Sequence, residues 1–354
     1  MIGEASDIER LAARILAAVK APLLHEGREL DCGASIGSAV FPFAGEQPES
    51  LLKNADVAMY TVKKAGGGQA TPYASWMRDD VQRRVSELSN AREALARNAI
   101  IPFYQPKISL RDGRIVGFEA LLRWTDPSGV RSPGAINEAF DDPDLAVKLG
   151  RRMLDRVVSD MAAWQVASVQ FGHVALNLAA HEFQDPGLAA RILSTLSAAR
   201  LEPGQLEIEV TEGVFMEDAS EVVGTTLRSL DEAGIAISLD DFGTGYASLT
   251  HLKKYPVSWL KIDRSFVSNV ETNPDSAAIV KAVVGLAQSI GIKVVAEGVE
   301  TERQWRFLKE KNCEVAQGFW LAKPMVGSRV PHFITNWAPL RIGVLASPAA
   351  IGVA

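Results

Sequence analysis

The sequence is poor in cysteine and contains no long apolar run. Its 354 residues include two cysteines, Cys32 and Cys313, which lie far apart and without metal-ligand spacing. We therefore expect reduced thiols in a cytoplasmic protein and no disulfide framework. No stretch of about 18 consecutive apolar residues is present, so the sequence predicts no membrane-spanning helix. The start, MIGEASDIERLAARILAAV, has the pattern of an amphipathic helix rather than of a signal peptide.

An excess of positive charge is also absent. The formal net charge is −6, so the sequence does not predict a protein that binds a nucleic-acid polymer through bulk positive charge. A small anionic ligand remains compatible with this balance where a local site supplies cations. Apolar residues make up 47% of the chain and charged residues 23%, which is ordinary for a globular protein.

Hydrophobic periodicity divides the chain into a small first part and a large second part. Residues 1–75 predict two helices around a strand pair, a partial α+β domain with a thin core. Residues 76–98 carry one apolar stripe among many charges and predict a connector helix, although a helix packed on a neighbouring domain fits equally well. Residues 99–340 alternate strand-like and helix-like segments, and we expect residues 341–354 to form a loosely ordered tail.

The larger part has the pattern of a barrel. Two strand-like segments flank RDGR at residues 111–114, which predicts a hairpin. Further strand-like runs follow, mostly alternating with helix-like segments: HVALNL, QLEIEVTE, IAISLDD, SWLKID, KVVAEG and EVAQGFW. This α/β pattern predicts a (β/α)8 TIM-like barrel with an antiparallel first strand. An open doubly wound sheet is the alternative, but no glycine-rich phosphate turn follows the first strand.

Polar side chains recur near the carboxyl ends of the predicted strands. Asp240 and Asp241 lie side by side after an apolar run, where two carboxylates about 4 Å apart would repel by ~4 kcal/mol at an effective dielectric of about 20. Strand alternation places further polar residues inward near the ends of other strands: Glu119, Asn177, Glu209, Lys261, Glu297 and Gln317. In a barrel these ends meet at one mouth, where such folds have their active sites.

The carboxylates at this mouth indicate a metal-dependent enzyme. Mg²⁺ or Mn²⁺, which prefer oxygen ligands, would offset their charge. The adjacent Asp240 and Asp241 suggest a carboxylate that bridges two such ions with a second ligand beside it, and a pair of ions of this kind fits hydrolysis of a phosphodiester. Each carboxylate taken alone also fits a helix cap or a rim ion pair. A glycosidase needs only two carboxylates and usually has more aromatic residues than the 7% here. A Schiff-base role for Lys261 leaves the carboxylates unexplained.

Several longer motifs occur in one order along the chain: EALLRW (119–124), LEIEVTE (206–212), DDFGTGYASL (240–249), LKIDRSFV (260–267), VVAEGVET (294–301) and QGFWLAKPM (317–325). Through them, residues 90–338 resemble the EAL family of cyclic di-GMP phosphodiesterases. The resemblance implies a barrel with a reversed first strand, cleavage of cyclic di-GMP to linear pGpG with two Mg²⁺ or Mn²⁺ ions, and a homodimer through the barrel.

The resemblance also implies roles for individual residues. The implied metal ligands are Glu119, Asn177, Glu209, Asp240, Asp241 and Glu297, with Asp240 bridging the ions and Asp241 on the second one. The implied catalytic residues are Lys261, which would hold the attacking water, Glu297, as a possible general base, and Asp241. The implied substrate-binding residues are Gln105, Leu122, Arg123, Gln317 and Pro324. Glu212 would steady the loop 242–248.

Two stretches depart from the family pattern without altering an implied ligand. Ala247 stands where a serine is common in the family. The segment SPGAINEAFDDPDLAVKLG lacks the family's usual FIPLAE-like motif, which affects contacts at the substrate rim. The intact ligand set favours catalysis over the main alternative, a receptor that binds cyclic di-GMP without cleaving it. A metal-dependent barrel enzyme acting on another phosphodiester is a more distant alternative.

Residues 1–75 resemble the C-terminal part of a GGDEF diguanylate cyclase domain. ASIGSAVFP and LLKNADVAMYTVKKAG carry this likeness, whereas the GGDEF signature is absent and Gly67 stands where an arginine is expected. The resemblance therefore implies a truncated and degenerate domain without cyclase activity, in a bacterial second-messenger protein whose upstream part is missing.

Overall fold

The computed structural model describes residues 5–25, 28–215, 220–243, 252 and 254–339. They form two compact units, Met1–Ser89 and Asn90–Ala354, and the division between the units falls within helix α3 (Ser75–Ala96). The tail predicted at residues 341–354 lies outside the described residues.

The N-terminal unit combines two helices with two small sheets. Helix α1 is Ala5–Lys20, helix α2 is Pro48–Lys64, and the strands are β1 (Leu23–His25), β2 (Arg28–Leu30), β3 (Ile36–Ser38) and β4 (Ala70–Pro72). Strands β3 and β4 pair in parallel and β1 and β2 pair antiparallel. The sequence predicted a single strand pair here. The β1–β2 pair was not predicted because each strand has only three residues and β1 is exposed throughout, so neither strand shows alternating burial.

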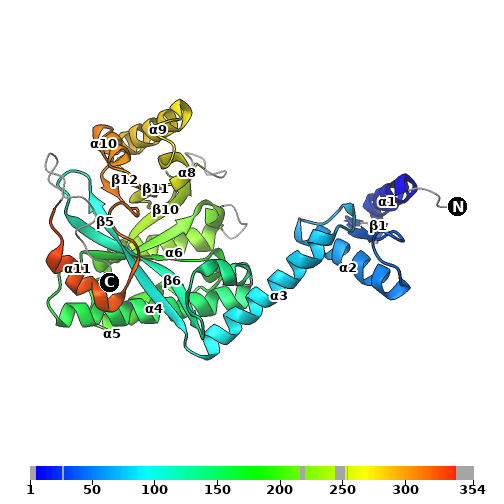
Figure 1. The fold of residues 1–354 in the computed structure, drawn as a ribbon, viewed down its shortest axis with the longest axis horizontal. Helices are drawn as coiled ribbons and strands as arrows, with labels where there is room; N and C mark the ends of the chain where they lie inside the picture. Colours follow the sequence, from blue (N-terminus) through cyan, green and yellow to red (C-terminus); the bar gives the residue numbers. More distant parts are fainter. Residues whose placement is uncertain (1–4, 26–27, 216–219, 244–251, 253, 340–354) are drawn as a thin grey trace. The chain divides into compact units, whose positions relative to one another are not determined.

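The C-terminal unit is a closed barrel of eight strands (Figure 1). Its strands are β5 (Ile100–Ser109), β6 (Ile115–Asp126), β8 (His173–Asn177), β9 (Leu206–Thr211), β10 (Ala236–Phe242), β11 (Trp259–Ile262), β12 (Lys293–Ala296) and β13 (Val315–Ala316). All neighbours pair in parallel except β5, which runs antiparallel to both β6 and β13. The predicted barrel with a reversed first strand is confirmed.

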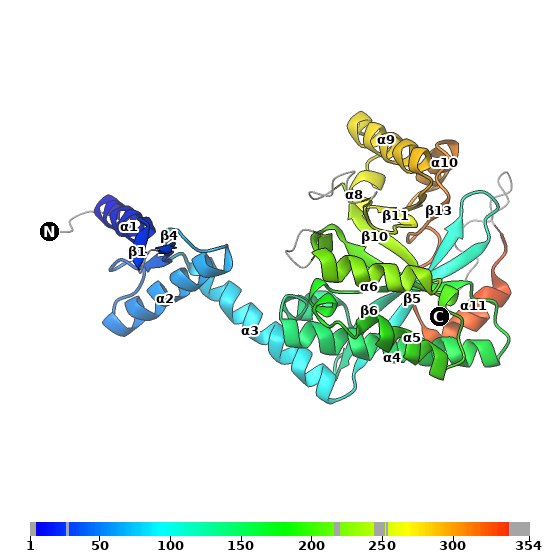
Figure 2. The ribbon, with the colours of Figure 1, turned by 180° about the vertical axis from the view of Figure 1, so that it is seen from behind.

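Helices lie around the outside of this barrel (Figure 2). They are α4 (Pro143–Val166), α5 (Leu188–Ala198), α6 (Ser220–Glu232), α8 (Arg264–Val267), α9 (Pro274–Ile290), α10 (Glu302–Glu310) and α11 (Val330–Asn336). Short 3-10 helices join them: η1 (Pro133–Ala139), η2 (Ala180–Gln184), η3 (Pro203–Gln205), η4 (Glu212–Phe215) and η5 (Gly327–Arg329). Two short strands, β7 (Gly129–Arg131) and β14 (Met325–Val326), extend the sheet beside β6 and β5. These two strands are too short for a sequence pattern to predict.

The faces of the barrel strands separate apolar from polar residues. Along β9, Leu206, Ile208 and Val210 are buried on one face, while Glu207 and Glu209 are buried on the other. Apolar side chains therefore pack against the helices, and the barrel interior carries charge.

No helix among the described residues combines the length and apolar character that crossing a membrane requires. Cys32 is exposed, Cys313 is buried, and neither forms a disulfide.

Candidate active site

The carboxyl end of β10 departs from regular strand geometry at the two adjacent aspartates. The pairing of β10 with β11 shifts register between Leu239 and Phe242, and Asp241 has a φ of 55°. Aspartate tolerates this left-handed conformation better than most residues do, because its short side chain can bond locally. Here the Asp241 amide donates to Asp240 Oδ1 at 2.9 Å. Asp240 is half-buried and Asp241 exposed, so the shift presents both carboxylates near the strand end.

The Lys261 ammonium lies among carboxylates on or just after four different strands: β6, β9, β10 and β12. Its Nζ atom is 2.7 Å from Glu209 Oε2, 2.7 Å from Glu297 Oε1, 3.0 Å from Asp240 Oδ2 and 3.6 Å from Glu119 Oε1. The Lys261 side chain is only 1% exposed, as expected for a cation enclosed by its partners. The structure therefore brings together the carboxylates that strand alternation placed at one mouth.

Three amide side chains join this cluster. Asn177 Nδ2 donates to Glu119 Oε1 at 3.0 Å and to Glu209 Oε2 at 3.2 Å. Gln317 Nε2 donates to Glu119 Oε2 at 2.5 Å and to Gln105 Oε1 at 3.1 Å. Gln105 Nε2 in turn donates to the Ala322 carbonyl at 3.0 Å. The amides thus hold Glu119 from both sides and tie the site to the segment that follows β13.

Burial raises the pKa of several of these carboxyl groups. It raises the pKa of Glu119 to about 7 and that of Glu297 to about 8, and neighbouring carboxylates add to the effect. The pKa of Asp241 is raised by the same two causes. Glu209 behaves differently: burial opposes its ionisation, but Lys107 and Lys261 lower its pKa. With all of these carboxyl groups ionised, the site would carry more negative charge than its two buried ammonium groups, Lys107 and Lys261, balance.

This donor set fits hard divalent cations. The side chains offer carboxylate and amide oxygens, which Mg²⁺ and Mn²⁺ prefer. Glu297 Oε1 is buried and makes no aligned hydrogen bond, although Lys261 Nζ is near. Among the described residues, however, no three His, Cys, Asp or Glu side chains form a ready ligand set. The carboxylates instead surround the Lys261 ammonium. The residues expected to bind metal therefore lie close together, but the described ones are not arranged as a metal-coordination site.

The other residues with implied roles lie around this cluster. Arg123 Nη1 donates to the Leu122 carbonyl at 2.7 Å, and its guanidinium lies over the Phe103 ring at 5.9 Å. Pro324 is half-buried and precedes β14, which pairs with β5 next to Gln105. Glu212 Oε1 accepts a hydrogen bond from the Gly243 amide at 3.1 Å. Residues 244–248 of the loop that Glu212 was expected to steady lie outside the described residues.

The sequence reasoning missed a second buried lysine. Lys107 is 1% exposed and contacts Glu207 and Glu209, and Glu207 in turn lies beside His173. A signal was available, because Lys107 follows Gln105 by two residues on β5 and Glu207 precedes Glu209 by two on β9. Both therefore share the inward face of residues that the sequence did single out.

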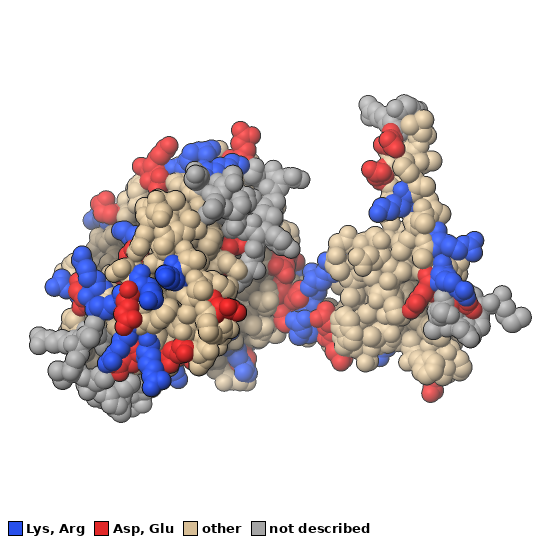
Figure 3. Space-filling model, turned by 90° about the horizontal axis from the view of Figure 1, so that it is seen from above, with Lys and Arg blue, Asp and Glu red and all other residues tan. Residues whose placement is uncertain are grey.

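Acidic and basic side chains are intermingled on the molecular surface seen in Figure 3, within the part of the chain that the structure describes. A broad electrostatic face for an anionic ligand is not apparent in this view. Attraction for such a ligand at the mouth would come from local cations such as Arg123.

The comparison with protein families matches the two parts of the chain separately. The EAL domain model matches residues 88–324, and the diguanylate cyclase GGDEF domain model matches residues 2–69. The chain belongs to the EAL domain family. A partial GGDEF domain precedes the EAL domain.

Curated relatives of this EAL protein are longer than the chain itself. The bifunctional diguanylate cyclase/cyclic di-GMP phosphodiesterase MucR of Pseudomonas aeruginosa is 38% identical over 323 residues, which is 91% of this chain and 47% of MucR. The cyclic di-GMP phosphodiesterase PdeR of Escherichia coli is 32% identical over 321 residues, 90% of this chain and 48% of PdeR. The chain spans about half the length of these relatives.

Solved structures agree with the fold. The phosphodiesterase of P. aeruginosa MucR in complex with c-di-GMP has 40% identity and a TM-score of 0.65, covering 69% of this chain and 99% of that one. The EAL enzyme Bd1971, with cAMP and cyclic di-GMP bound, has 25% identity and a TM-score of 0.68, covering 82% and 76%.

Proposed function

We propose that this chain hydrolyses one phosphodiester bond of cyclic di-GMP, giving linear pGpG, with Mg²⁺ or Mn²⁺ as cofactor. The observation that carries the proposal is the cluster of Glu119, Glu209, Asp240 and Glu297 around Lys261 at the barrel mouth. Relatives that share the EAL domain include proteins named as cyclic di-GMP phosphodiesterases. The activity is assigned to residues 99–340, with residues 76–98 as a connector helix.

Two ions would be held by the oxygen donors of the mouth: Glu119, Asn177, Glu209, Asp240, Asp241 and Glu297. Divalent ions bound there would lower the pKa of water and offset the negative charge of the phosphate.

The remaining residues bind the substrate and handle the proton. Arg123 has donors left after its bond to the Leu122 carbonyl and suits bidentate contact with a phosphate. Gln105, Leu122, Gln317 and Pro324 form the rim for the nucleotide. Lys261 orients the attacking water. Glu297, 2.7 Å from Lys261 Nζ, accepts the proton of that water.

The test is chromatography of nucleotides after incubation of the full chain with cyclic di-GMP. We expect pGpG with Mn²⁺ or Mg²⁺ and none with a chelator. Glu119→Gln and Asp240→Asn should each lower turnover by at least about a hundredfold, because loss of outer contacts to a metal already costs 10–100-fold. Glu310→Gln, an exposed change on α10, is the matched control and should keep wild-type turnover.

Normal turnover by either ligand variant would contradict the metal assignment. Binding of cyclic di-GMP without cleavage, measured by titration on the same sample, would favour the receptor alternative. A homodimer through the barrel and a cytoplasmic location remain predictions of the resemblance and of the composition.

A further inference from the structure

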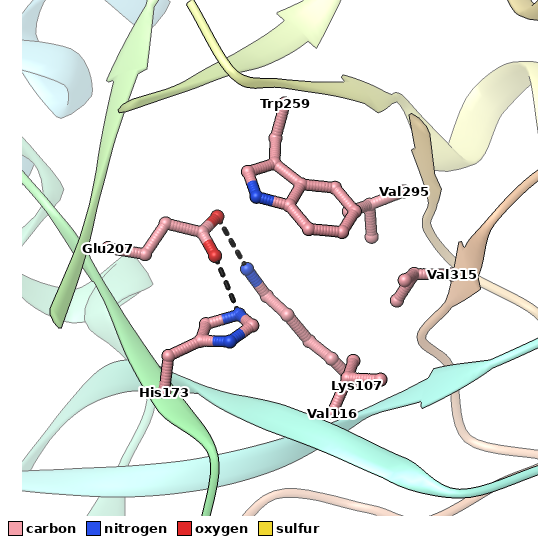
Figure 4. A pocket seen from close by; sticks show the side chains of 7 residues that line it. All are labelled: Lys107, Val116, His173, Glu207, Trp259, Val295 and Val315. Carbon is pink, nitrogen blue, oxygen red and sulfur yellow. Dashed lines mark hydrogen bonds and ion pairs between the residues drawn. The ribbon is translucent and has the colours of Figure 1, made fainter. Parts of the chain in front are cut away.

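A second cluster of buried charge lies inside the barrel and shares Glu209 with the cluster around Lys261. Lys107 Nζ is 2.9 Å from Glu207 Oε1 and 2.8 Å from Glu209 Oε1, and none of the three side chains is more than 1% exposed. Figure 4 shows the Lys107 ammonium directed at Glu207, with Trp259 above it and valine side chains beside its stem. The proposed reaction assigns no task to Lys107 or Glu207.

Glu209 joins this cluster to the mouth. Its Oε1 atom faces Lys107, while its Oε2 atom faces Lys261 at 2.7 Å and accepts from Asn177 at 3.2 Å. Glu209 Oε1 therefore faces the barrel interior, and Glu209 Oε2 faces the mouth. Because the two oxygens are rigidly linked, a contact that fixes Oε1 also fixes the direction of Oε2.

The interior is shaped to keep Lys107 in this place. His173 Nε2 lies 2.8 Å from Glu207 Oε2, the oxygen of that carboxylate that Lys107 leaves free by contacting Oε1 (Figure 4). The His173 ring fits because residue 117 is glycine: a Cβ there would lie 2.9 Å from ring atoms Cδ2 and Nε2 and 2.5 Å from the His173 carbonyl oxygen. Each oxygen of the Glu207 carboxylate thus has its own partner.

Within this cluster, Glu207 offsets the positive charge of Lys107. Lys107 carries one positive charge and Glu207 one negative charge, so the pair is neutral as a unit. A lone buried lysine beside Glu209 would cancel the charge that a metal ligand needs. Paired with Glu207, Lys107 orients Glu209 without adding a net positive charge beside that carboxylate.

We propose that Lys107, held by Glu207, is a positioning residue of the candidate active site, fixing the Glu209 carboxylate so that Oε2 faces the mouth to bind a divalent ion. The inference rests on the proposed function, since that proposal makes Glu209 a metal ligand. Contacts of this kind, one layer behind the ligands, commonly tune metal affinity.

The experiment titrates Mn²⁺ into the full chain by calorimetry and records the thermal unfolding of the same samples. It compares wild type with Lys107→Met and with the double variant Lys107→Met/Glu207→Gln, which removes the pair and restores charge balance. Both variants should bind Mn²⁺ about 10–100-fold more weakly than wild type. Lys107→Met should also unfold at a lower temperature, because Glu207 and Glu209 are left buried without their shared cation, and the double variant should recover that loss.

Comparing the Mn²⁺ affinity with the unfolding temperature of each variant separates two roles of Lys107: positioning the Glu209 carboxylate and stabilising the fold. Wild-type Mn²⁺ affinity in the folded Lys107→Met protein, or recovery of both affinity and stability in the double variant, would overturn the proposal. If Lys107→Met does not fold, the charge-balanced double variant carries the comparison. Wild type that binds Mn²⁺ but leaves cyclic di-GMP intact would contradict the proposed reaction alone. Wild type that binds no Mn²⁺ would overturn both.

Discussion

At the scale of single residues, Glu182 is a buried acid outside the candidate site. It is 2% exposed and faces α4 at Gly150, where a Cβ would lie 2.1 Å from its Oε1 atom. The Ala179 amide donates to its Oε2 atom at 3.0 Å. Burial raises the pKa of Glu182 to about 7, and the hydrogen bond from the Ala179 amide and the charges of Arg191 and Arg151 oppose this only in part. Its ionisation therefore costs stability.

The sign of this effect gives a pH prediction. The pKa of Glu182 is about 7 in the folded chain and about 4.3 in an unfolded chain, so folding stability is lost as the pH rises between these values. Glu182→Gln removes the ionisable group and keeps an oxygen for the Ala179 amide. We expect the variant to match wild type within about 1 kcal/mol at pH 5 and to be more stable by about 1–3 kcal/mol at pH 8.

Urea unfolding at the two pH values measures the difference. Glu310→Gln, on an exposed position of α10, is the control and should give the same small change at both. A Glu182→Gln effect that does not grow with pH would refute the assignment of the raised pKa.

At the scale of elements, two strand ends approach each other without room for a side chain. A Cβ on Gly318, just after β13, would lie 2.1 Å from the Val299 carbonyl oxygen and 2.3 Å from the Val299 nitrogen. Both atoms are backbone, so neither can swing away. Gly318→Ala should destabilise the chain by about 1–3 kcal/mol, as overpacking does. It should also reduce turnover, because Gln317 is the preceding residue and contacts Glu119.

Gly285 in α9 is the matched control for this prediction. A Cβ there meets no atom within 4 Å, and alanine is favoured over glycine inside helices, so Gly285→Ala should stabilise by about 0.5–1 kcal/mol. Thermal unfolding and pGpG formation are measured on both variants. Equal effects of the two substitutions would mean that the close approach at Gly318 is not maintained in solution.

Strands with clear alternation were predictable, and their inward side chains with them. The pattern of β9 gave Glu209 its inward face, and the inward residues of β6, β10, β11 and β12 followed the same rule, although Glu119 lies in the first half of β6 rather than at its end. The local bend at Asp241 was not predictable, because the register shift that produces it depends on pairing with β11. The inward face of Lys107 was predictable, but its contacts were not, because Glu207 and Glu209 become its neighbours only when the barrel closes. That four carboxylates surround Lys261 was likewise not predictable, because the distances between residues on different strands cannot be obtained from the sequence.

At the scale of the whole molecule, all residues of the candidate site belong to the second unit. The earliest of them in the chain is Gln105, and that unit begins at Asn90. Ala91 and Ala94, in the last turns of α3, are buried. The EAL match begins at residue 88, so a chain of residues 88–339 keeps these turns and the complete barrel.

We therefore predict that residues 88–339 alone fold cooperatively and retain Mn²⁺ binding and metal-dependent formation of pGpG at the rate of the full chain. Circular dichroism on heating, Mn²⁺ titration and nucleotide chromatography measure the three properties, with Glu119→Gln in the short chain as the inactive control. A short chain that folds and binds Mn²⁺ but cleaves more slowly would mean that the partial GGDEF domain acts on the rate of the barrel, although it contributes none of the candidate site residues. A short chain that does not fold would instead mean that the barrel depends on the first unit for stability.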